Sequence, residues 1–140
     1  MKAIKQHSQQ AVTDPVSSEH TADASRLRIT EIFHSLQGES SYVGLPTVFV
    51  RLTGCPLRCN YCDTAYAFSG GEWMSLADIR AQVASYGARQ VCVTGGEPLA
   101  QTACIELLSA LCDDGYRVSV ETSGAMDVCA VDPRVSRIMD

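Results

Sequence analysis

The sequence predicts an α/β fold in which short apolar strands alternate with helices and form a parallel sheet. Two observations lead to this prediction. Short apolar runs end at glycines, and two of the segments between them repeat apolar residues with the helical period. The composition agrees, because a chain of 140 residues with 46% hydrophobic and 19% charged residues is typical of globular proteins. Disorder throughout the chain is excluded by this apolar content.

The first half of the chain contains two predicted strands and one long loop. Residues 27–35 form the first strand, with Leu27 and Phe33 expected on the same face because alternate residues share a face. Residues 47–52 form the second strand, which Gly54 stops. In residues 55–71 the apolar residues follow neither the strand period nor the helical period, which predicts a loop that contains three cysteines. Loops of that length inside compact domains are usually functional.

The second half alternates helices and strands. Ser75 is predicted to cap a helix that Gly87 ends, and residues 90–94 read as a buried strand. Apolar residues recur at helical spacing over residues 100–111, and residues 116–121 are again a strand. Residues 134–139 are compatible with one more strand.

The polar segments follow these predicted strands. A parallel sheet places its chemistry at the carboxyl ends of its strands. We therefore expect four segments to converge on one edge: residues 37–39, 51–55, 94–98 and 121–124.

Charge and cysteine content exclude several classes of protein. The net charge is −5 without any Lys/Arg run, which argues against a nucleic-acid or membrane-surface partner. No stretch of about 18 apolar residues predicts a membrane span. Residues 1–25 are polar, lack a secretory signal and are expected to be a flexible tail, so residues 26–140 form the domain. Seven cysteines in such a chain favour a reducing, cytoplasmic location, where cysteine clusters bind metal more often than they form disulfides.

Three cysteines follow the pattern C-x3-C-x2-C at Cys55, Cys59 and Cys62. They are one ligand short of a closed zinc site, and no histidine lies within their loop. On a four-iron cluster, three thiolates leave one iron open for another ligand. With Tyr61 before the last cysteine, the pattern resembles the radical S-adenosylmethionine (SAM) superfamily. Residues 94–98, Thr-Gly-Gly-Glu-Pro, are similar to the GGEP element of that superfamily.

Further motifs resemble one family within this superfamily, the 7-carboxy-7-deazaguanine synthases. They are residues 33–39, 51–55, 62–64 and 120–124, with Gly44 and Pro46. The resemblance implies a radical SAM core shaped as a TIM-like barrel of parallel strands. It also implies a carbon–nitrogen lyase of queuosine biosynthesis, which contracts 6-carboxy-5,6,7,8-tetrahydropterin to 7-carboxy-7-deazaguanine with loss of ammonia. Relatives continue through further strands, so the resemblance implies a C-terminally truncated chain and a partial barrel. It also implies a homodimer and an electron donor such as flavodoxin.

The resemblance also assigns roles to residues. The [4Fe–4S] cluster would be held by Cys55, Cys59 and Cys62, and Mg²⁺ by Thr64, since Mg²⁺ prefers oxygen ligands. SAM would lie against Tyr61, Cys62, Asp63, Gly95, Gly96 and Glu97. An arginine fork suits a carboxylate, so Arg51 would bind the substrate carboxylate. The other expected substrate contacts are Leu36, Gln37, Gly38, Glu39, Thr94 and Glu121.

Other interpretations stay open. Arg51 could be a surface ion-pair partner, Gln37 a turn residue, Thr64 a cap and Gly95–Gly96 a tight turn. At the level of function, the chain could be another radical SAM enzyme, such as a glycyl-radical activase, or a non-catalytic metal-binding module. Ser40 stands where the family usually carries glycine. The remaining cysteines are predicted to be small apolar residues of the fold: Cys92, Cys104, Cys112 and Cys129.

Overall fold

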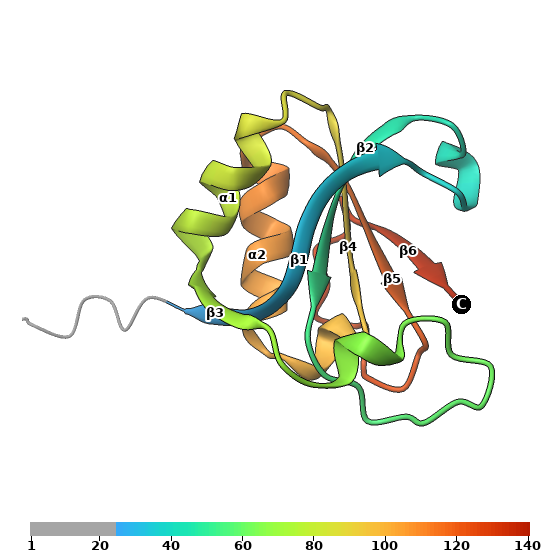
Figure 1. Ribbon diagram of the computed structural model, residues 1–140. Helices are drawn as coiled ribbons and strands as arrows, with labels where there is room; N and C mark the ends of the chain where they lie inside the picture. The colour runs from blue at the N-terminus through green and yellow to red at the C-terminus, as the bar shows by residue number, and fades with distance from the viewer. Residues whose placement is uncertain (1–24) are drawn as a thin grey trace, which may run out of the picture.

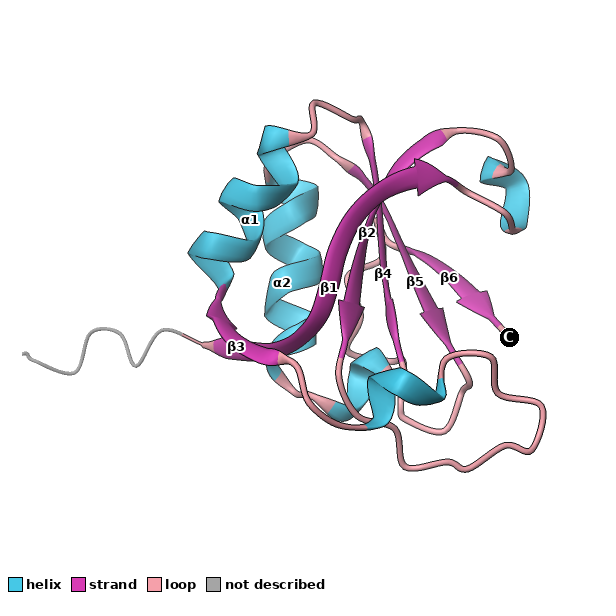
Figure 2. Cartoon of the chain, viewed as in Figure 1, coloured by secondary structure: helices cyan, strands magenta, loops and turns pink. Residues whose placement is uncertain are grey.

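A six-stranded sheet covered on one face by two helices organises residues 25–140, the part of the chain that the computed structural model describes (Figures 1 and 2). The strand order is β3-β1-β2-β4-β5-β6. The predicted tail, residues 1–25, lies outside the described residues except for Ser25. None of the helices in residues 25–140 combines the length and apolar character that crossing a bilayer requires.

The observed elements match most of the predicted ones within a few residues. The exceptions are β3, where residues 72–74 were assigned to no element and Ser75 to a helix cap, and α2, which begins after a short 3-10 turn. The strands are β1 (Arg26–Leu36), β2 (Pro46–Leu52), β3 (Glu72–Ser75), β4 (Gln90–Gly95), β5 (Arg117–Thr122) and β6 (Ser136–Met139). The helices are α1 (Leu76–Ser85) and α2 (Ala103–Asp113), with 3-10 turns η1 (Ser40–Tyr42), η2 (Ala65–Phe68) and η3 (Pro98–Ala100).

The sheet is mixed, so the prediction of a wholly parallel sheet is only partly right. Strands β2, β4, β5 and β6 are parallel neighbours, whereas β1 pairs antiparallel with both β2 and β3. Residues 37–45 join β1 to β2 as a hairpin, and a parallel pair would need a much longer crossover. The end of β1 therefore lies at the opposite end of β2 from Gly54. The expectation that all four polar segments lie at one edge is wrong for residues 37–39.

The two faces of the sheet differ in chemistry because alternate residues of each strand point to opposite sides. One face packs on α1 and α2 and is apolar. Its central strand residues are fully buried: Val48, Val50, Leu52, Val91, Val93 and Val120. The opposite face carries Phe49, Arg51, Thr94 and Glu121, which line a pocket.

A β-bulge in β1 changes which residues face the pocket. The pairing with β2 shifts between Ile29, opposite Leu52, and Glu31, opposite Arg51. Because one extra residue reverses the alternation, Leu27 and Ile29 face the helices whereas Glu31 and Phe33 face the other side. The expectation that Leu27 and Phe33 share a face is therefore wrong.

Both helices follow the sequence signals. Ser75 caps α1 by accepting a hydrogen bond from the backbone N–H of Asp78 at 3.1 Å, as predicted. The predicted apolar stripe of α2 is confirmed, since its inward residues are completely buried: Cys104, Leu107, Leu108 and Leu111.

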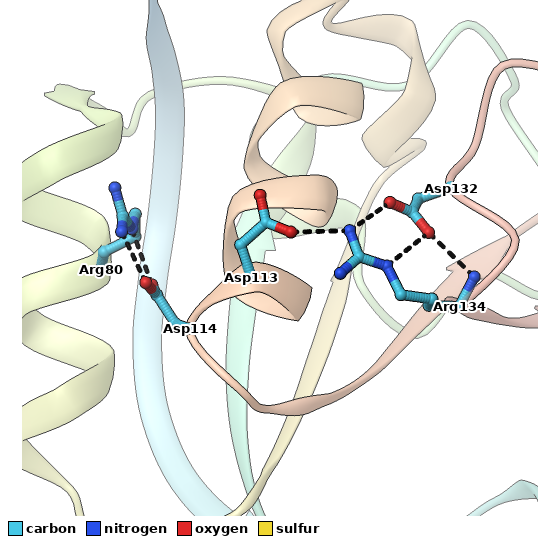
Figure 3. A network of polar contacts seen from close by, with 5 residues as sticks. All are labelled: Arg80, Asp113, Asp114, Asp132 and Arg134. Atoms are coloured by element: carbon cyan, nitrogen blue, oxygen red, sulfur yellow. Dashed lines mark hydrogen bonds and ion pairs between the residues drawn. The ribbon is translucent and has the colours of Figure 1, made fainter.

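Ion pairs connect the C-terminal end of α2 to its neighbours (Figure 3). Arg80 of α1 binds Asp114 at 2.6 Å, and this hydrogen-bonded guanidinium holds the pKa of Asp114 below its usual range. Arg134, in the connection to β6, bridges Asp132 at 2.7 Å and Asp113 at 2.8 Å. The same arginine lowers the pKa of Asp132. These contacts link α1 to α2 and α2 to the last connection.

Gln101, between η3 and α2, completes the hydrogen bonding where the β1–β2 ladder is irregular. Its Oε1 accepts a hydrogen bond from the N–H of Arg28 at 2.8 Å. Its Nε2 donates to the carbonyl oxygens of Arg28 and Thr53, each at 2.9 Å. The amide therefore ties β1 to the end of β2 through a side chain and adds to the backbone hydrogen bond that Thr53 N donates to the Arg28 carbonyl at 2.8 Å.

Candidate active site

A pocket of about 600 Å³ lies on the face of the sheet opposite the helices. All but one of the residues that the sequence predicts for the site line it. They are Leu36, Gln37, Gly38, Glu39, Arg51, Cys55, Cys59, Tyr61, Cys62, Asp63, Thr64, Thr94, Gly95, Gly96 and Glu121. The exception is Glu97. Sequence analysis assigned no role to the other lining residues, which are Phe33, Ser35, Phe49, Phe68, Ser123 and Asp140.

Residues 37–39 reach the pocket from the end of the sheet opposite the cysteines. Gln37 is buried, and its Nε2 donates to Glu121 Oε1 at 3.3 Å while its Oε1 accepts from the N–H of Glu39 at 3.2 Å. Its backbone also bonds to Gly44 and Leu45, as a turn residue would. The amide of Gln37 therefore both closes the hairpin and orients a carboxylate that faces the pocket.

Ser40, next in this hairpin, adopts a left-handed backbone with φ of 64°. Glycine adopts this conformation without the steric cost that a Cβ brings. The Ser40 hydroxyl partly compensates by accepting a hydrogen bond from the N–H of Tyr42 at 3.2 Å. This explains physically why a glycine is suited to this position.

The three cysteines of the loop after β2 are partly exposed and all line the pocket. The N–H of Cys62 donates to the carbonyl of Cys59 at 3.3 Å, and Arg58 donates to the carbonyl of Cys55 at 2.7 Å. None of the cysteines in residues 25–140 forms a disulfide. The thiols are therefore available as ligands on one rim of the pocket.

The arrangement of the thiols suits a cluster better than a single ion. Within residues 25–140, no three His, Cys, Asp or Glu side chains converge closely enough to hold one metal ion. A closed zinc site requires four ligands around one point. An iron–sulfur cluster instead takes each thiolate on a different iron, so its ligands stand around a volume. Three separated thiols beside an open pocket fit the second donor set.

Gly95 and Gly96 allow the end of β4 to pack against the start of the cysteine loop. A Cβ at Gly95 would lie 2.7 Å from the carbonyl oxygen of Leu52, and one at Gly96 would lie 2.3 Å from that of Gly54. The N–H of Glu97 donates to the same Gly54 carbonyl at 2.9 Å. The close approach that requires glycine is therefore already made by the protein itself, and both glycines also face the pocket.

Glu97 is completely buried behind the pocket wall and does not line it. Its carboxylate accepts hydrogen bonds from Leu99 N at 3.1 Å and from Thr122 Oγ1 at 2.9 Å. It also accepts from the N–H and Oγ of Ser123, at 2.9 and 2.7 Å. These four donor groups all belong to the fold, so the carboxylate holds the end of β5 against the turn after β4.

Arg51 is both an ion-pair partner and a pocket residue. Its side chain is 17% exposed, and its Nε donates to Glu31 Oε1 at 2.8 Å. Tyr66 donates its hydroxyl to the same oxygen at 2.8 Å, and burial together with this hydrogen bond raises the pKa of Tyr66. Behind these groups, the rings of Phe33 and Phe49 stack with centroids 5.1 Å apart. Sequence analysis did not identify Glu31 and Tyr66 as partners of Arg51.

Several carboxylates lie near one another in the lining of the pocket. Burial, followed by repulsion from Asp140, Glu121 and Asp63, raises the pKa of Glu39. Thr64 precedes η2, but its side chain makes no cap hydrogen bond and its hydroxyl instead donates to Asp63 Oδ1 at 2.5 Å. Oxygen atoms therefore cluster beside the third cysteine.

The four other cysteines differ in their surroundings. Cys104 belongs to the core and Cys112 packs partly against it, as predicted. Cys92 is buried, on the pocket side of β4, and burial raises the pKa of its thiol to about 12. Cys129, predicted to be a small apolar residue of the fold, lies exposed in the connection between β5 and β6.

Comparison with known proteins identifies the family. Residues 49–138 match the model of the Radical SAM superfamily. The chain is 52% identical over 114 residues to a 7-carboxy-7-deazaguanine synthase from Chlorobaculum tepidum, covering 81% of this chain and 52% of that protein. It is 47% identical over 116 residues to the protein of the same name from Koribacter versatilis, covering 81% and 51%. The chain thus spans about half the length of these relatives.

A solved structure gives the same result. The crystal structure of QueE from Escherichia coli matches with a TM-score of 0.72 and 30% sequence identity, over 80% of this chain and 58% of that one. The resemblance drawn from the motifs is confirmed by these relatives, whose superfamily implies a [4Fe–4S] cluster and SAM. With the family model matched over residues 49–138, the chain belongs to the Radical SAM superfamily.

Proposed function

We propose that this chain forms the cluster-binding and substrate-binding part of a 7-carboxy-7-deazaguanine synthase. The reaction would be the ring contraction of 6-carboxy-5,6,7,8-tetrahydropterin to 7-carboxy-7-deazaguanine with release of ammonia. One observation carries the proposal: residues 37–39, the cysteine loop, the glycine pair and Glu121 line the same pocket although they come from both ends of the sheet. The names of the similar proteins support the choice of this reaction.

Three thiols would hold the cluster, namely those of Cys55, Cys59 and Cys62. When bound, the cluster and SAM would supply the one-electron chemistry that abstracts hydrogen from an unactivated carbon. Tyr61 and Asp63 flank Cys62, and Gly95 and Gly96 face the same space, so these residues would lie against SAM. The support for this is the shared lining of one pocket by the thiols and the glycine pair. Glu97 would act indirectly, by holding the turn that contains the glycines.

The substrate would occupy the part of the pocket between β1 and β5. Arg51 would bind its carboxylate, because a guanidinium edge pairs with a carboxylate in a bidentate manner. Glu121 accepts one hydrogen bond from Gln37 and retains lone pairs for the N–H groups of a guanine-like edge. Thr94 offers a hydroxyl from β4. The remaining wall would come from Leu36, Gly38 and Glu39.

Mg²⁺ would bind next to the third cysteine. Thr64 and its hydrogen-bonded neighbour Asp63 place oxygen atoms there, and Mg²⁺ prefers oxygen ligands while keeping several waters. The ion would help to orient the substrate carboxylate. Burial is the main cause of the raised pKa of Glu39; repulsion from neighbouring carboxylates adds to it, and a cation would relieve that repulsion.

The larger assembly follows from the same family. We infer that residues 26–140 form a radical SAM core and part of a TIM-like barrel, which the four parallel strands and the polar inner face support. A second copy of the chain and an electron donor such as flavodoxin would complete the working enzyme. The acidic net charge of −5 gives no support to a nucleic-acid partner.

Anaerobic reconstitution with iron and sulfide tests the proposal. We expect a [4Fe–4S] absorption band, and an electron paramagnetic resonance signal that changes when SAM is added. Cys59→Ala should lose the cluster, whereas Cys129→Ala, which changes an exposed cysteine far along the chain, should retain it. Incubation with the carboxypterin, reductant and Mg²⁺ should then yield the deazapurine.

Each alternative function gives a different result in this experiment. Uptake of one zinc without sulfide would instead support a non-catalytic metal-binding module. A cluster that responds to SAM and cleaves it, without forming the deazapurine, would support a different radical enzyme, such as a glycyl-radical activase.

A further inference from the structure

Glu31 lies on the pocket side of the sheet only because β1 is irregular. Without the bulge after Ile29, strand alternation would point Glu31 toward the helices, with Leu27 and Ile29. With the bulge, Glu31 stands directly opposite Arg51 on β2 and its side chain remains 40% exposed. Bulges are known to redirect side chains beside functional sites. The position of this carboxylate beside a pocket arginine therefore calls for a functional explanation.

Two side chains bind the same oxygen of Glu31. Arg51 Nε and the Tyr66 hydroxyl each donate to Oε1 at 2.8 Å. The guanidinium carbon of Arg51 also lies 5.8 Å from the ring centroid of Phe33 and 5.7 Å from that of Tyr66. A guanidinium that contacts two aromatic rings and has its Nε fixed by a hydrogen bond can rotate little.

This arrangement leaves one edge of the guanidinium available. Within residues 25–140, the only hydrogen bond of the Arg51 side chain is the one from Nε to Glu31. The two terminal nitrogens therefore form an unused fork on a residue that lines the pocket. A fork of two N–H groups matches the two oxygens of a carboxylate.

We propose that Glu31 is a positioning residue, which with Tyr66 holds Arg51 so that its terminal nitrogens bind a ligand carboxylate. The inference rests on the proposed function, in which Arg51 takes the carboxylate of the pterin. Arginine loses much rotamer freedom when it is immobilised, and here that loss is incurred on folding, before the ligand binds. Ligand binding then gains from the preorganised fork.

The negative charge of Glu31, unlike its positioning of Arg51, is expected to weaken the binding of a ligand carboxylate. A carboxylate near Arg51 repels the carboxylate of a ligand and partly neutralises the arginine. If neutralisation dominated, removal of Glu31 would strengthen carboxylate binding. If positioning dominates, removal of Glu31 weakens it. The sign of the change therefore distinguishes the two roles.

The test compares the binding of 6-carboxytetrahydropterin with that of its 6-carboxamide by anaerobic calorimetry on the reconstituted protein. Wild-type protein should prefer the carboxylate. In Glu31→Ala this preference should fall about tenfold, the effect of losing one hydrogen bond between charged groups. Glu31→Gln keeps the acceptor oxygen and should bind the carboxylate no more weakly than wild type. Glu72→Ala, an exposed glutamate on β3, is the control and should leave the preference unchanged.

A second measurement needs no ligand. The Nε–H resonance of Arg51 in ¹⁵N NMR should exchange slowly with water in wild type and in Glu31→Gln, and rapidly in Glu31→Ala. Tyr66→Phe removes one partner of Glu31 and should reduce the preference for the carboxylate about twofold to threefold, as loss of a weaker, indirect contact would.

The outcomes separate cleanly. An unchanged or increased preference in Glu31→Ala overturns the positioning role while leaving the proposed function intact. If Glu31→Ala does not fold, an unchanged preference in Tyr66→Phe overturns it. Equal binding of carboxylate and carboxamide by wild-type protein overturns the assignment of Arg51, and with it both this inference and that part of the proposed function.

Discussion

Replacement of Glu97 by glutamine should destabilise the fold more than any surface change of the same kind. The substitution keeps the size of the side chain, so it creates no cavity. The new NH₂ group takes the place of one carboxylate oxygen. If it replaces Oε2, the N–H and hydroxyl of Ser123 lose the acceptor that they contact at 2.9 and 2.7 Å. If it replaces Oε1, Leu99 N and Thr122 Oγ1 lose theirs. In either orientation, an NH₂ group then faces a backbone N–H, and two donors cannot bond.

The magnitude follows from the number of donors affected. A buried N–H left without an acceptor costs about 1–3 kcal/mol, and the remaining bonds lose the strength that the charged acceptor gives them. We expect Glu97→Gln to lower the free energy of unfolding by about 2–4 kcal/mol. The total free energy of unfolding of a domain is about 5–15 kcal/mol, so this loss is a large fraction of it. For a chain of this size the midpoint of thermal unfolding should fall by about 6–15 °C.

Urea unfolding of the reduced, metal-free protein measures this change by far-ultraviolet circular dichroism. The unfolding midpoint should shift without a change in the slope against urea, since the area exposed on unfolding stays the same. Glu72→Gln provides the control, because Glu72 is exposed and makes no side-chain hydrogen bond among the described residues; its effect should stay within about 0.5 kcal/mol. A Glu97→Gln protein as stable as this control would refute the argument that the fold requires a charged acceptor at this position.

Four other changes test further parts of the structure. Gly96→Ala should cost about 1–3 kcal/mol in urea unfolding because its Cβ would meet a carbonyl oxygen at 2.3 Å, whereas Gly38→Ala, with open space around it, should stay within about 0.5 kcal/mol. Ser40→Gly should stabilise the protein by about 1 kcal/mol by relieving a positive φ of 64°. Iodoacetamide at pH 8 should label the exposed Cys129 and spare Cys104, because burial raises the pKa of the Cys104 thiol to about 12. Mass spectrometry of the treated protein measures both. The pKa of Glu39 is raised in the folded protein, so the stability that Glu39 contributes is present at low pH and is lost as the pH rises through the folded-state pKa. As the pH rises through that pKa, Glu39→Gln should therefore gain stability relative to wild type. Equal urea midpoints of the two proteins at every pH would contradict this.

The sequence predicts the parts of this fold that depend on strong local patterns. The strand at Gln90–Gly95 contains the apolar run 91–93 and ends at a glycine pair, and α2 repeats its apolar residues at the helical period over several turns. Both were therefore recognisable without knowledge of their neighbours. β3 was missed because Glu72–Ser75 has only four residues and lies at the edge of the sheet, where pairing with β1 defines it and apolar alternation does not.

Features that depend on pairing between distant segments could not be predicted in this way. The antiparallel direction of β1 follows from its hairpin, and the bulge becomes visible only when Ile29 and Glu31 are aligned with β2. For the same reason Glu31 was not recognised as the partner of Arg51.

The sequence predicted most of the residues that line the pocket, because the motifs are contiguous in sequence and each lies at the end of a strand or in a loop. Glu97 shows the limit of this reasoning. Its place within the glycine-rich motif suggested contact with a ligand, but its carboxylate is bound by Thr122 and Ser123 from the next strand. A motif specifies which residues occur together, whereas the direction of each side chain depends on segments far away in the chain.

The division of each central strand between an apolar and a polar face has a consequence for how this protein can change. Thr94 faces the pocket and Val93 beside it faces the helices, so single substitutions can alter recognition without disturbing the core. An insertion or deletion of one residue in β4 would exchange these two neighbours, placing a hydroxyl among the helices and a valine against the ligand. New specificities should therefore arise in this scaffold by point replacement or by changes in loop length, and hardly ever by changes in the length of its central strands.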